Sequence, residues 1–120
     1  MKILVVDDSK AMRMIVIRSL KQAGFTKHTT IEASNGREAL ELIQSEKPDL
    51  VFSDWNMPEM KGIELLQKVR EAEIPVRFGF ITSESSPETK QQATAAGAEF
   101  VLTKPFTPES LMATLEPVLS

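Results

Sequence analysis

Short apolar runs alternate with longer amphipathic stretches along the chain, and the alternation repeats five times. The runs that predict strands lie at residues 3–6, 28–33, 50–52, 76–82 and 100–102, the second being the weakest. Continuous apolar runs of this length are typical of strands buried on both faces of a sheet. The stretches between them repeat apolar residues at helical spacing. Five strand–helix repeats predict an α/β fold: a doubly wound, five-stranded parallel sheet with helices on both faces.

Capping residues and glycines mark where helices begin and end. Ser9 is placed to cap the first helix and Gly24 to end it. Ser86 followed by Pro87 has the form of an N-cap and a first helical residue, and Gly97 closes the same helix. The connections are short and contain no linker or internal repeat, so we expect one domain over residues 1–120.

Composition narrows the classes of function. Of the 120 residues, 42% are hydrophobic and 26% are charged, and the net charge is −3. An acidic chain with scattered Lys and Arg predicts neither nucleic acid nor an anionic membrane as a partner. The absence of cysteine excludes thiolate and disulfide chemistry, and a single histidine, His28, argues against a Ser-His-Asp triad. No apolar run is long enough for a membrane span, and Asp7 comes too early for a signal peptide, so a cytoplasmic location is expected.

Polar residues that carry chemistry cluster directly behind the predicted strands. They are Asp7 and Asp8 after the first strand, Asp54 after the third, Thr82 and Ser83 after the fourth, and Lys104 after the fifth. The carboxyl ends of parallel strands share one edge of the sheet, where ligands bind. The sequence therefore predicts one pocket that contains three carboxylates and an ammonium group.

Such a pocket favours a divalent cation and phosphoryl chemistry. Crowded carboxylates repel one another, and a hard cation such as Mg²⁺, which prefers oxygen ligands, relieves the repulsion. The cation and Lys104 together can neutralise the oxygens of a phosphoryl group in transfer, and Thr82 can donate a hydrogen bond to one of them. Each residue alone has an ordinary explanation, since an Asp behind a strand often caps a helix. Their joint placement is what favours the site.

The sequence around these residues resembles a known family. The motifs are Val6-Asp7-Asp8-Ser9, Ser53-Asp54-Trp55-Asn56-Met57-Pro58, Ile81-Thr82-Ser83 and Lys104-Pro105-Phe106. In this order they resemble the receiver domains of response regulators, most of all the single-domain chemotaxis regulators, over essentially the whole chain. The resemblance implies a flavodoxin-like fold with strand order 2-1-3-4-5.

The resemblance also implies roles for the residues of the pocket. Asp54 would be the phosphoacceptor. Asp8, Asp54 and the backbone carbonyl of Asn56 would ligate Mg²⁺, with Asp7 positioning the ion through water. Lys104 would pair with the phosphoryl group. A receiver domain catalyses only its own phosphorylation and dephosphorylation, so we do not expect an enzyme that acts on a separate substrate.

Further positions would govern access of the phosphodonor, the lifetime of the phosphoryl group and switching. Ser83 would leave room for the phosphodonor, Asn56 and Glu84 would modulate attack by water, and Pro105 would follow a cis peptide bond. Thr82 would be the switch hydroxyl, which in the family moves together with an aromatic residue. At that aromatic position this chain has Val101.

The aromatic residue of this chain, Phe100, comes one position earlier. Because side chains alternate between the faces of a strand, Phe100 is not expected to replace the missing ring. The switch would then use another element or give a weaker output, or Val101 would simply pack beside the threonine.

The first helix suggests a contact surface. Its predicted inward stripe consists of Ala11, Met12, Ile15, Val16, Leu20 and Ala23. Met14 and Ile17 are expected on the opposite side among basic residues, and exposed apolar residues ringed by charge often mark an interface. Since the family docks its phosphodonor partly through this helix, we predict that Met14 and Ile17 contact that partner, although they could also be incidental surface residues.

The expected partners are a histidine kinase or phosphotransfer protein and a downstream protein, which in chemotaxis would be the flagellar motor switch. The chain could instead be a stand-alone phosphorelay intermediate or the receiver part of a longer regulator. A phosphohydrolase with an aspartate nucleophile typically has its two aspartates two residues apart after the first strand, whereas Asp7 and Asp8 are adjacent. A scaffold that only binds partners has usually lost the acidic pocket, and flavin binding lacks a phosphate loop.

Overall fold

The computed structural model describes residues 1–24, 28–83 and 86–119, and its centre is a parallel sheet with the order β2-β1-β3-β4-β5. The strands are β1 (Lys2–Val6), β2 (Thr29–Ala33), β3 (Leu50–Asp54), β4 (Arg77–Thr82) and β5 (Phe100–Thr103). The helices are α1 (Lys10–Gln22), α2 (Gly36–Glu46), α3 (Gly62–Glu71), α4 (Pro87–Ala95) and α5 (Pro108–Leu119). The predicted fold class and strand order are confirmed.

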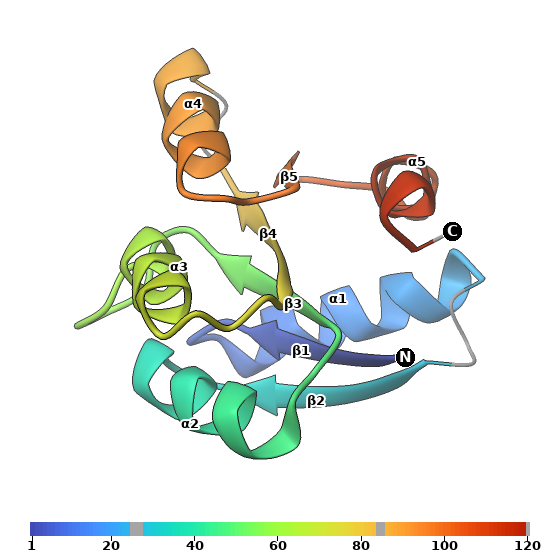
Figure 1. The fold of residues 1–120 in the computed structure, drawn as a ribbon. Coiled ribbons are helices and arrows are strands. Elements are labelled where there is room, and N and C mark those ends of the chain that lie inside the picture. Colours follow the sequence, from blue (N-terminus) through green and yellow to red (C-terminus); the bar gives the residue numbers. More distant parts are fainter. Residues whose placement is uncertain (25–27, 84–85, 120) are drawn as a thin grey trace.

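Helices cover both faces of the sheet, so each face has its own core. Figure 1 shows α1 and α5 on one side of the sheet, and α2, α3 and α4 on the other. The core under α1 and α5 contains Ile3, Val5, Val16, Leu20, Leu50, Phe52, Leu111 and Leu115. The other core contains Leu4, Val6, Ile43, Val51, Leu65, Leu66, Phe78 and Phe80. Successive residues of a strand alternate between the two cores, which is why the strands read as continuous apolar runs.

The predicted helix boundaries are confirmed. The side chain of Ser9 accepts a hydrogen bond from the backbone N–H of Met12, and that of Ser86 accepts one from the N–H of Thr89. Gly24 and Gly97, which follow the C-caps of α1 and α4, have φ angles of 99° and 102°. These left-handed conformations favour glycine.

The predicted inward stripe of α1 is partly wrong. Ile15 was expected to face inward, but 45% of it is exposed, and Ala11 is exposed as well. Ile17 was expected on the outer side, but it is half-buried against the core under α1 and α5. Helical spacing places Ile15 and Ile17 symmetrically beside the central Val16, so the pattern does not reveal which flank is covered. The flank with Ile17 borders a surface hollow beside β2, and the flank with Ile15 is exposed.

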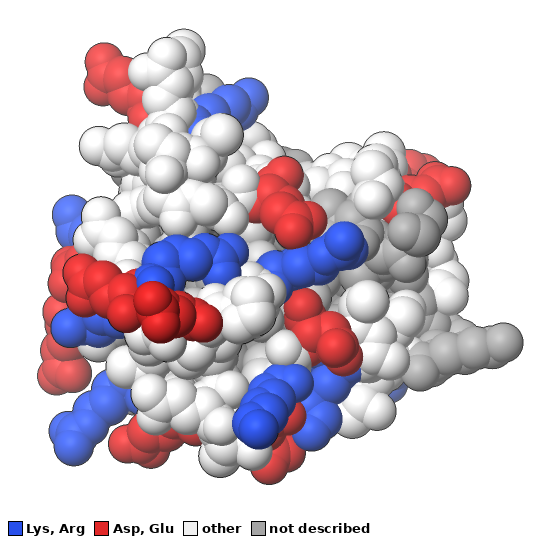
Figure 2. Space-filling model, in the orientation of Figure 1, with Lys and Arg blue, Asp and Glu red and all other residues white. Residues whose placement is uncertain are grey.

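The surface in view carries charges of both signs. Figure 2 shows acidic and basic side chains interspersed on this face, without one large basic area. Within residues 1–24, 28–83 and 86–119, no helix combines the length and apolar character needed to span a membrane.

Candidate functional site

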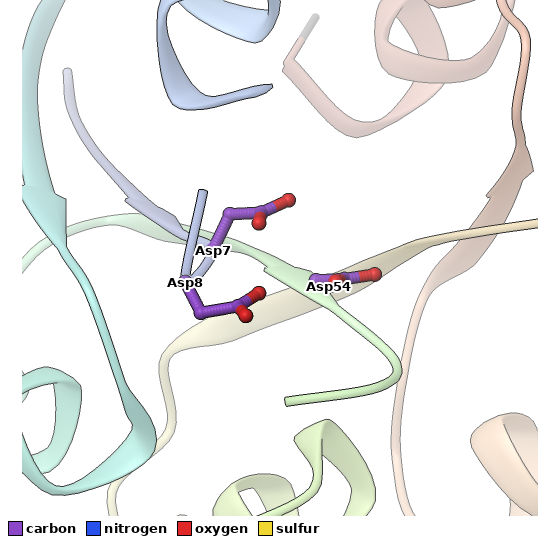
Figure 3. Close-up of side chains that lie close together, drawn as sticks. All are labelled: Asp7, Asp8 and Asp54. Atoms are coloured by element: carbon purple, nitrogen blue, oxygen red, sulfur yellow. The ribbon is translucent and has the colours of Figure 1, made fainter. Parts of the chain in front are cut away.

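Three carboxylates meet where β1 and β3 end. The two strands are neighbours in the sheet, with Val6 opposite Ser53, so Asp7 and Asp54 lie side by side. Asp8 follows in the turn that leads into α1. One oxygen from each carboxylate lies within 4.8 Å of the others, and Figure 3 shows the three side chains together. The predicted convergence of Asp7, Asp8 and Asp54 is confirmed.

Lys104, the residue after β5, reaches the same cluster. Its Nζ donates a hydrogen bond of 3.3 Å to Oδ1 of Asp54 and lies 3.8 Å from Oδ2 of Asp7. Its backbone N–H donates to the carbonyl of Thr82 over 2.8 Å, which fixes the end of β5 against β4. The peptide bond to Pro105 is cis, as predicted. The ammonium group therefore lies directly beside the predicted phosphoacceptor.

Burial and mutual repulsion lower the stability of the fold while all the carboxylates of this cluster are charged. Burial, the largest influence, raises the pKa of both Asp7 and Asp54. The hydrogen bond from the Ser9 N–H and the charge of Lys104 lower the pKa of Asp7, and the charges of Asp54 and Asp8 raise it. Lys104 lowers the pKa of Asp54, while Asp8 raises it.

The donor set fits Mg²⁺. Three carboxylates outnumber one ammonium group, so a divalent cation would neutralise the excess charge. Asp7 and Asp54 are largely shielded from solvent, whereas Asp8 is exposed. The exposed side leaves room for the water ligands that Mg²⁺ usually keeps in proteins. Asp8 and Asp54 would hold the ion, which would neutralise charge on a phosphoryl group.

Comparison with known proteins agrees with the geometry. The family model of the response regulator receiver domain matches residues 3–116. The chain belongs to this family. The match includes the three carboxylates and Lys104, so the resemblance seen in the sequence is confirmed.

Relatives of this receiver domain align over nearly its full length. Chemotaxis protein CheY1 of Helicobacter pylori is 41% identical over 124 residues, which cover 99% of this chain and 97% of that protein. Chemotaxis protein CheY of Pseudomonas aeruginosa is 39% identical, with 98% and 95% covered. The solved structure of Vibrio cholerae chemotaxis protein CheY4 has a TM-score of 0.87 and 42% identity, with 98% of each chain covered.

The predicted access and switch residues of the receiver domain lie at the end of β4. Thr82 is its last residue and is fully buried, while Ser83 is exposed. Glu84 lies outside the described residues. A small, exposed Ser83 agrees with the predicted room for a phosphodonor. The roles of Thr82 and Ser83 remain predictions.

Val101 and Phe100 face opposite sides of the sheet, as predicted. Val101 packs against the core under α2, α3 and α4. Phe100 packs on the other face, where its ring meets that of Phe52 edge-on at a centroid distance of 4.9 Å. Phe100 therefore does not occupy the place of the family's aromatic residue. How Val101 affects switching remains a prediction.

The segment after Asp54 is held close to the site. The N–H of Trp55 donates to the carbonyl of Ile81 over 3.1 Å, and the N–H of Gly62 donates to the carbonyl of Trp55 over 3.0 Å. A Cβ at position 62 would overlap the carbonyl oxygen of Asp54, so glycine permits this close approach. Asn56 is exposed in this loop. Its roles in binding the ion and in dephosphorylation remain predictions.

The two predicted docking residues differ in exposure. Met14 is 49% exposed, whereas Ile17 is half-buried, so the prediction of two exposed neighbours is wrong for Ile17. Both border a surface hollow between α1 and β2, together with Arg18, Lys21, Thr30 and Glu32. Neither side chain belongs to the carboxylate cluster.

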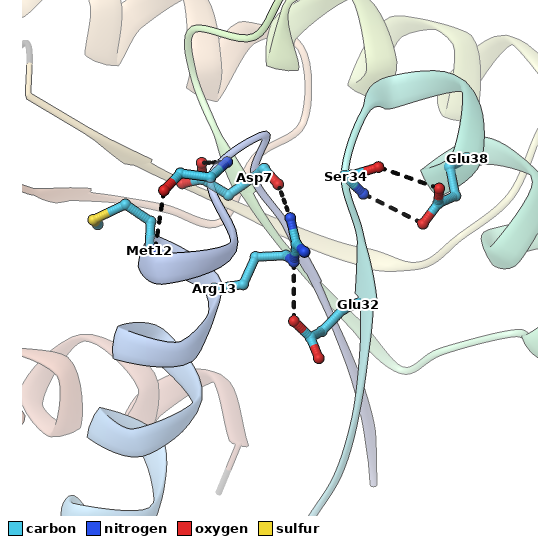
Figure 4. A network of polar contacts seen from close by, with 7 residues as sticks. Asp7, Met12, Arg13, Glu32, Ser34 and Glu38 are labelled. Carbon is cyan, nitrogen blue, oxygen red and sulfur yellow. Dashed lines mark hydrogen bonds and ion pairs between the residues drawn. The ribbon is translucent and has the colours of Figure 1, made fainter.

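Arg13 contacts the site and was missed by the sequence analysis. Its Nη1 donates a 2.7 Å hydrogen bond to the carbonyl oxygen of Asp7, and its Nε lies 2.9 Å from Oε1 of Glu32 (Figure 4). The available signal was a basic residue beside the inward stripe of α1, one turn after its N-cap. Such a signal is weak, because basic residues often flank an apolar stripe with only their stems buried.

Proposed function

We propose that this receiver domain is a phosphorylation-dependent switch in a two-component pathway, with Asp54 as the phosphoacceptor and Mg²⁺ as its cofactor. The observation that carries the proposal is the cluster of Asp7, Asp8 and Asp54 with Lys104 Nζ 3.3 Å from Asp54. The similarity to chemotaxis proteins supports a role in chemotaxis.

The residues of the site would have separate roles in phosphoryl transfer. A carboxylate oxygen of Asp54 would attack the phosphorus atom of the donor, and the leaving group would depart on the opposite side. Lys104 lies where it can neutralise charge on the transferred group. Bound Mg²⁺ would supply further positive charge for the same oxygens. The exposure of Ser83 supports entry of the donor from solvent.

The proposed partners follow from this chemistry. The donor would be the phosphohistidine of a histidine kinase or phosphotransfer protein, and the phosphorylated domain would bind a downstream protein such as the flagellar motor switch. The domain would work in the cytoplasm and act as a switch rather than as an enzyme with a separate substrate. The net charge of −3 argues against nucleic acid as its target.

Acetyl phosphate tests the central step without any partner protein. Incubation with acetyl phosphate and Mg²⁺, followed by intact mass measurement, should show a gain of one phosphoryl group. The gain should disappear in Asp54→Ala and in EDTA. Asp49→Asn is a matched control, because Asp49 is an exposed acid beside the opposite end of β3. Phosphorylation that persists in Asp54→Ala would contradict the assignment of the acceptor.

A further inference from the structure

Arg13 joins three elements at the edge of the carboxylate cluster. From α1, it donates to the carbonyl oxygen of Asp7 at the end of β1 and pairs with Glu32 on β2. Only 13% of its side chain is exposed, and Figure 4 shows it between these two partners. Helical side chains lean toward the N-terminus of their helix, which allows Arg13 to reach back to a residue that precedes α1.

The carbonyl that Arg13 holds belongs to the peptide unit between Asp7 and Asp8. Because a peptide unit is planar, fixing its oxygen also fixes the direction in which the chain enters Asp8. Asp7 is held in two further ways: its N–H donates to the carbonyl of Ala33 over 3.1 Å, and its Oδ1 accepts from the N–H of Ser9 over 2.9 Å. The backbone around Asp8 therefore depends on a small set of contacts that includes Arg13.

The position of the Asp8 carboxylate depends mainly on this backbone. Asp8 is exposed, and no hydrogen bond from the described part of the chain holds its side chain. Its oxygen nevertheless lies within 4.8 Å of oxygens of Asp7 and Asp54. A change in the Asp7–Asp8 peptide would move the Asp8 carboxylate relative to the other two.

We propose that Arg13, held by Glu32, is a positioning residue of the cation site. It fixes the Asp7–Asp8 peptide and thereby keeps the Asp8 carboxylate near those of Asp7 and Asp54. This inference rests on the proposed function, since it takes the three carboxylates to be a Mg²⁺ site. The guanidinium group contacts a main-chain oxygen, so the carboxylates stay available to the cation. Arginine suits this role because its rigid, planar group donates in several fixed directions at once.

Charge and geometry predict opposite effects when Arg13 is removed. A cation near the site repels Mg²⁺, so replacing Arg13 by a neutral residue would tighten Mg²⁺ binding through charge alone. Loss of the positioning contact would weaken binding, because contacts that orient metal ligands typically contribute about ten- to a hundredfold in affinity. The direction of the change therefore distinguishes the two effects.

Calorimetric titration of the metal-free chain with Mg²⁺ measures this direction. Arg13→Gln should weaken binding about tenfold. Arg13→Lys keeps the charge and should weaken it to a smaller extent, because a single ammonium group does not reproduce both contacts. Arg37→Gln on α2 is the matched control, since it makes the same change of charge at a side chain that is 89% exposed. Its affinity should stay within about twofold of the wild type.

Phosphorylation by acetyl phosphate provides a second readout. In Arg13→Gln the Mg²⁺ concentration for half-maximal rate should rise, whereas the rate at saturating Mg²⁺ should return to the wild-type value. A general loss of stability would not produce this split. Unfolding curves in EDTA establish which variants are folded at the temperature of the titration.

Two outcomes would overturn the inference. If the wild type binds Mg²⁺ and Arg13→Gln binds equally or more tightly, Arg13 does not position the site, while the proposed function stands. If the wild type binds no Mg²⁺, the metal site and the inference both fail. Should Arg13→Gln not fold, Arg13→Lys decides the question, because its unchanged charge leaves geometry as the cause of any weakening.

Discussion

The carboxylate cluster predicts that Asp54→Asn stabilises the metal-free domain. Asp54 repels two neighbouring carboxylates within 4.8 Å and attracts Lys104 at 3.3 Å. With an effective dielectric constant of about 20, each repulsion is about 3.5 kcal/mol before screening and the attraction is about 5 kcal/mol, so the two nearly offset each other. Solvent around the exposed Asp8 screens its share. Burial of the Asp54 charge, the largest influence on its pKa, therefore decides the sign of the effect. Asparagine keeps an acceptor for Lys104, so the expected gain is about 1–2 kcal/mol in unfolding free energy at pH 7.

The gain should depend on pH. Burial raises the pKa of Asp54 above its ordinary value of 3.8, so the native protein binds this proton more readily than the unfolded chain does. The wild type therefore loses stability as the pH rises through the native pKa of Asp54. Well below pH 3.8 the carboxyl group of Asp54 is protonated in both the native and the unfolded state. The stability difference that comes from its charge should therefore vanish there.

Urea unfolding in EDTA measures this effect, with far-UV circular dichroism and the fluorescence of the single tryptophan, Trp55, as probes. Asp49→Asn is the control for loss of an acidic residue outside the cluster. Added Mg²⁺ should reverse the order, because binding stabilises the wild type in proportion to its occupancy and stabilises Asp54→Asn less. The reasoning is refuted if Asp54→Asn is less stable than the wild type in EDTA at pH 7 with an unchanged m-value.

Two other substitutions test the packing and the docking surface. Gly79→Ala should destabilise the domain by about 1–3 kcal/mol, because its Cβ would overlap the ring of Phe100 on the neighbouring strand. In urea unfolding, combining it with Phe100→Ala should cost less than the two single changes together, and strict additivity would contradict this explanation. Met14→Ser should slow phosphotransfer from the phosphodonor protein several-fold, with no change in the rate from acetyl phosphate. Ile15→Ser is its control, since Ile15 is similarly exposed at 45%, and equal slowing with both donors would exclude a docking role for Met14.

Much of the fold and of the site could be predicted because both depend on strand direction. In a parallel sheet the carboxyl ends of the strands share one edge, so placing Asp7, Asp54 and Lys104 behind strands was enough to bring them together. The contacts of α1 outside the carboxylate cluster were not predictable from strand direction. The covered flank of α1 depends on how the helix packs on the sheet and beside α5, which helical spacing does not encode. The contact of Arg13 with a backbone carbonyl likewise depends on the path of the turn before α1.

Stability and the proposed function place opposite demands on Asp54 and Asp8. Without a cation, the crowded carboxylates lower the stability of the fold, and neutralising one of them relieves the strain. A cation held by Asp8 and Asp54 would offset the repulsion among the three carboxylates, so the same crowding would favour its binding. The loss of stability that the cluster causes in the metal-free domain is therefore linked to the affinity of the cluster for Mg²⁺. Both the loss and the affinity depend on keeping the carboxylates close together. Arg13 would act on the affinity, because letting Asp8 move away would weaken cation binding, while the loss of its contacts with Asp7 and Glu32 would itself cost stability.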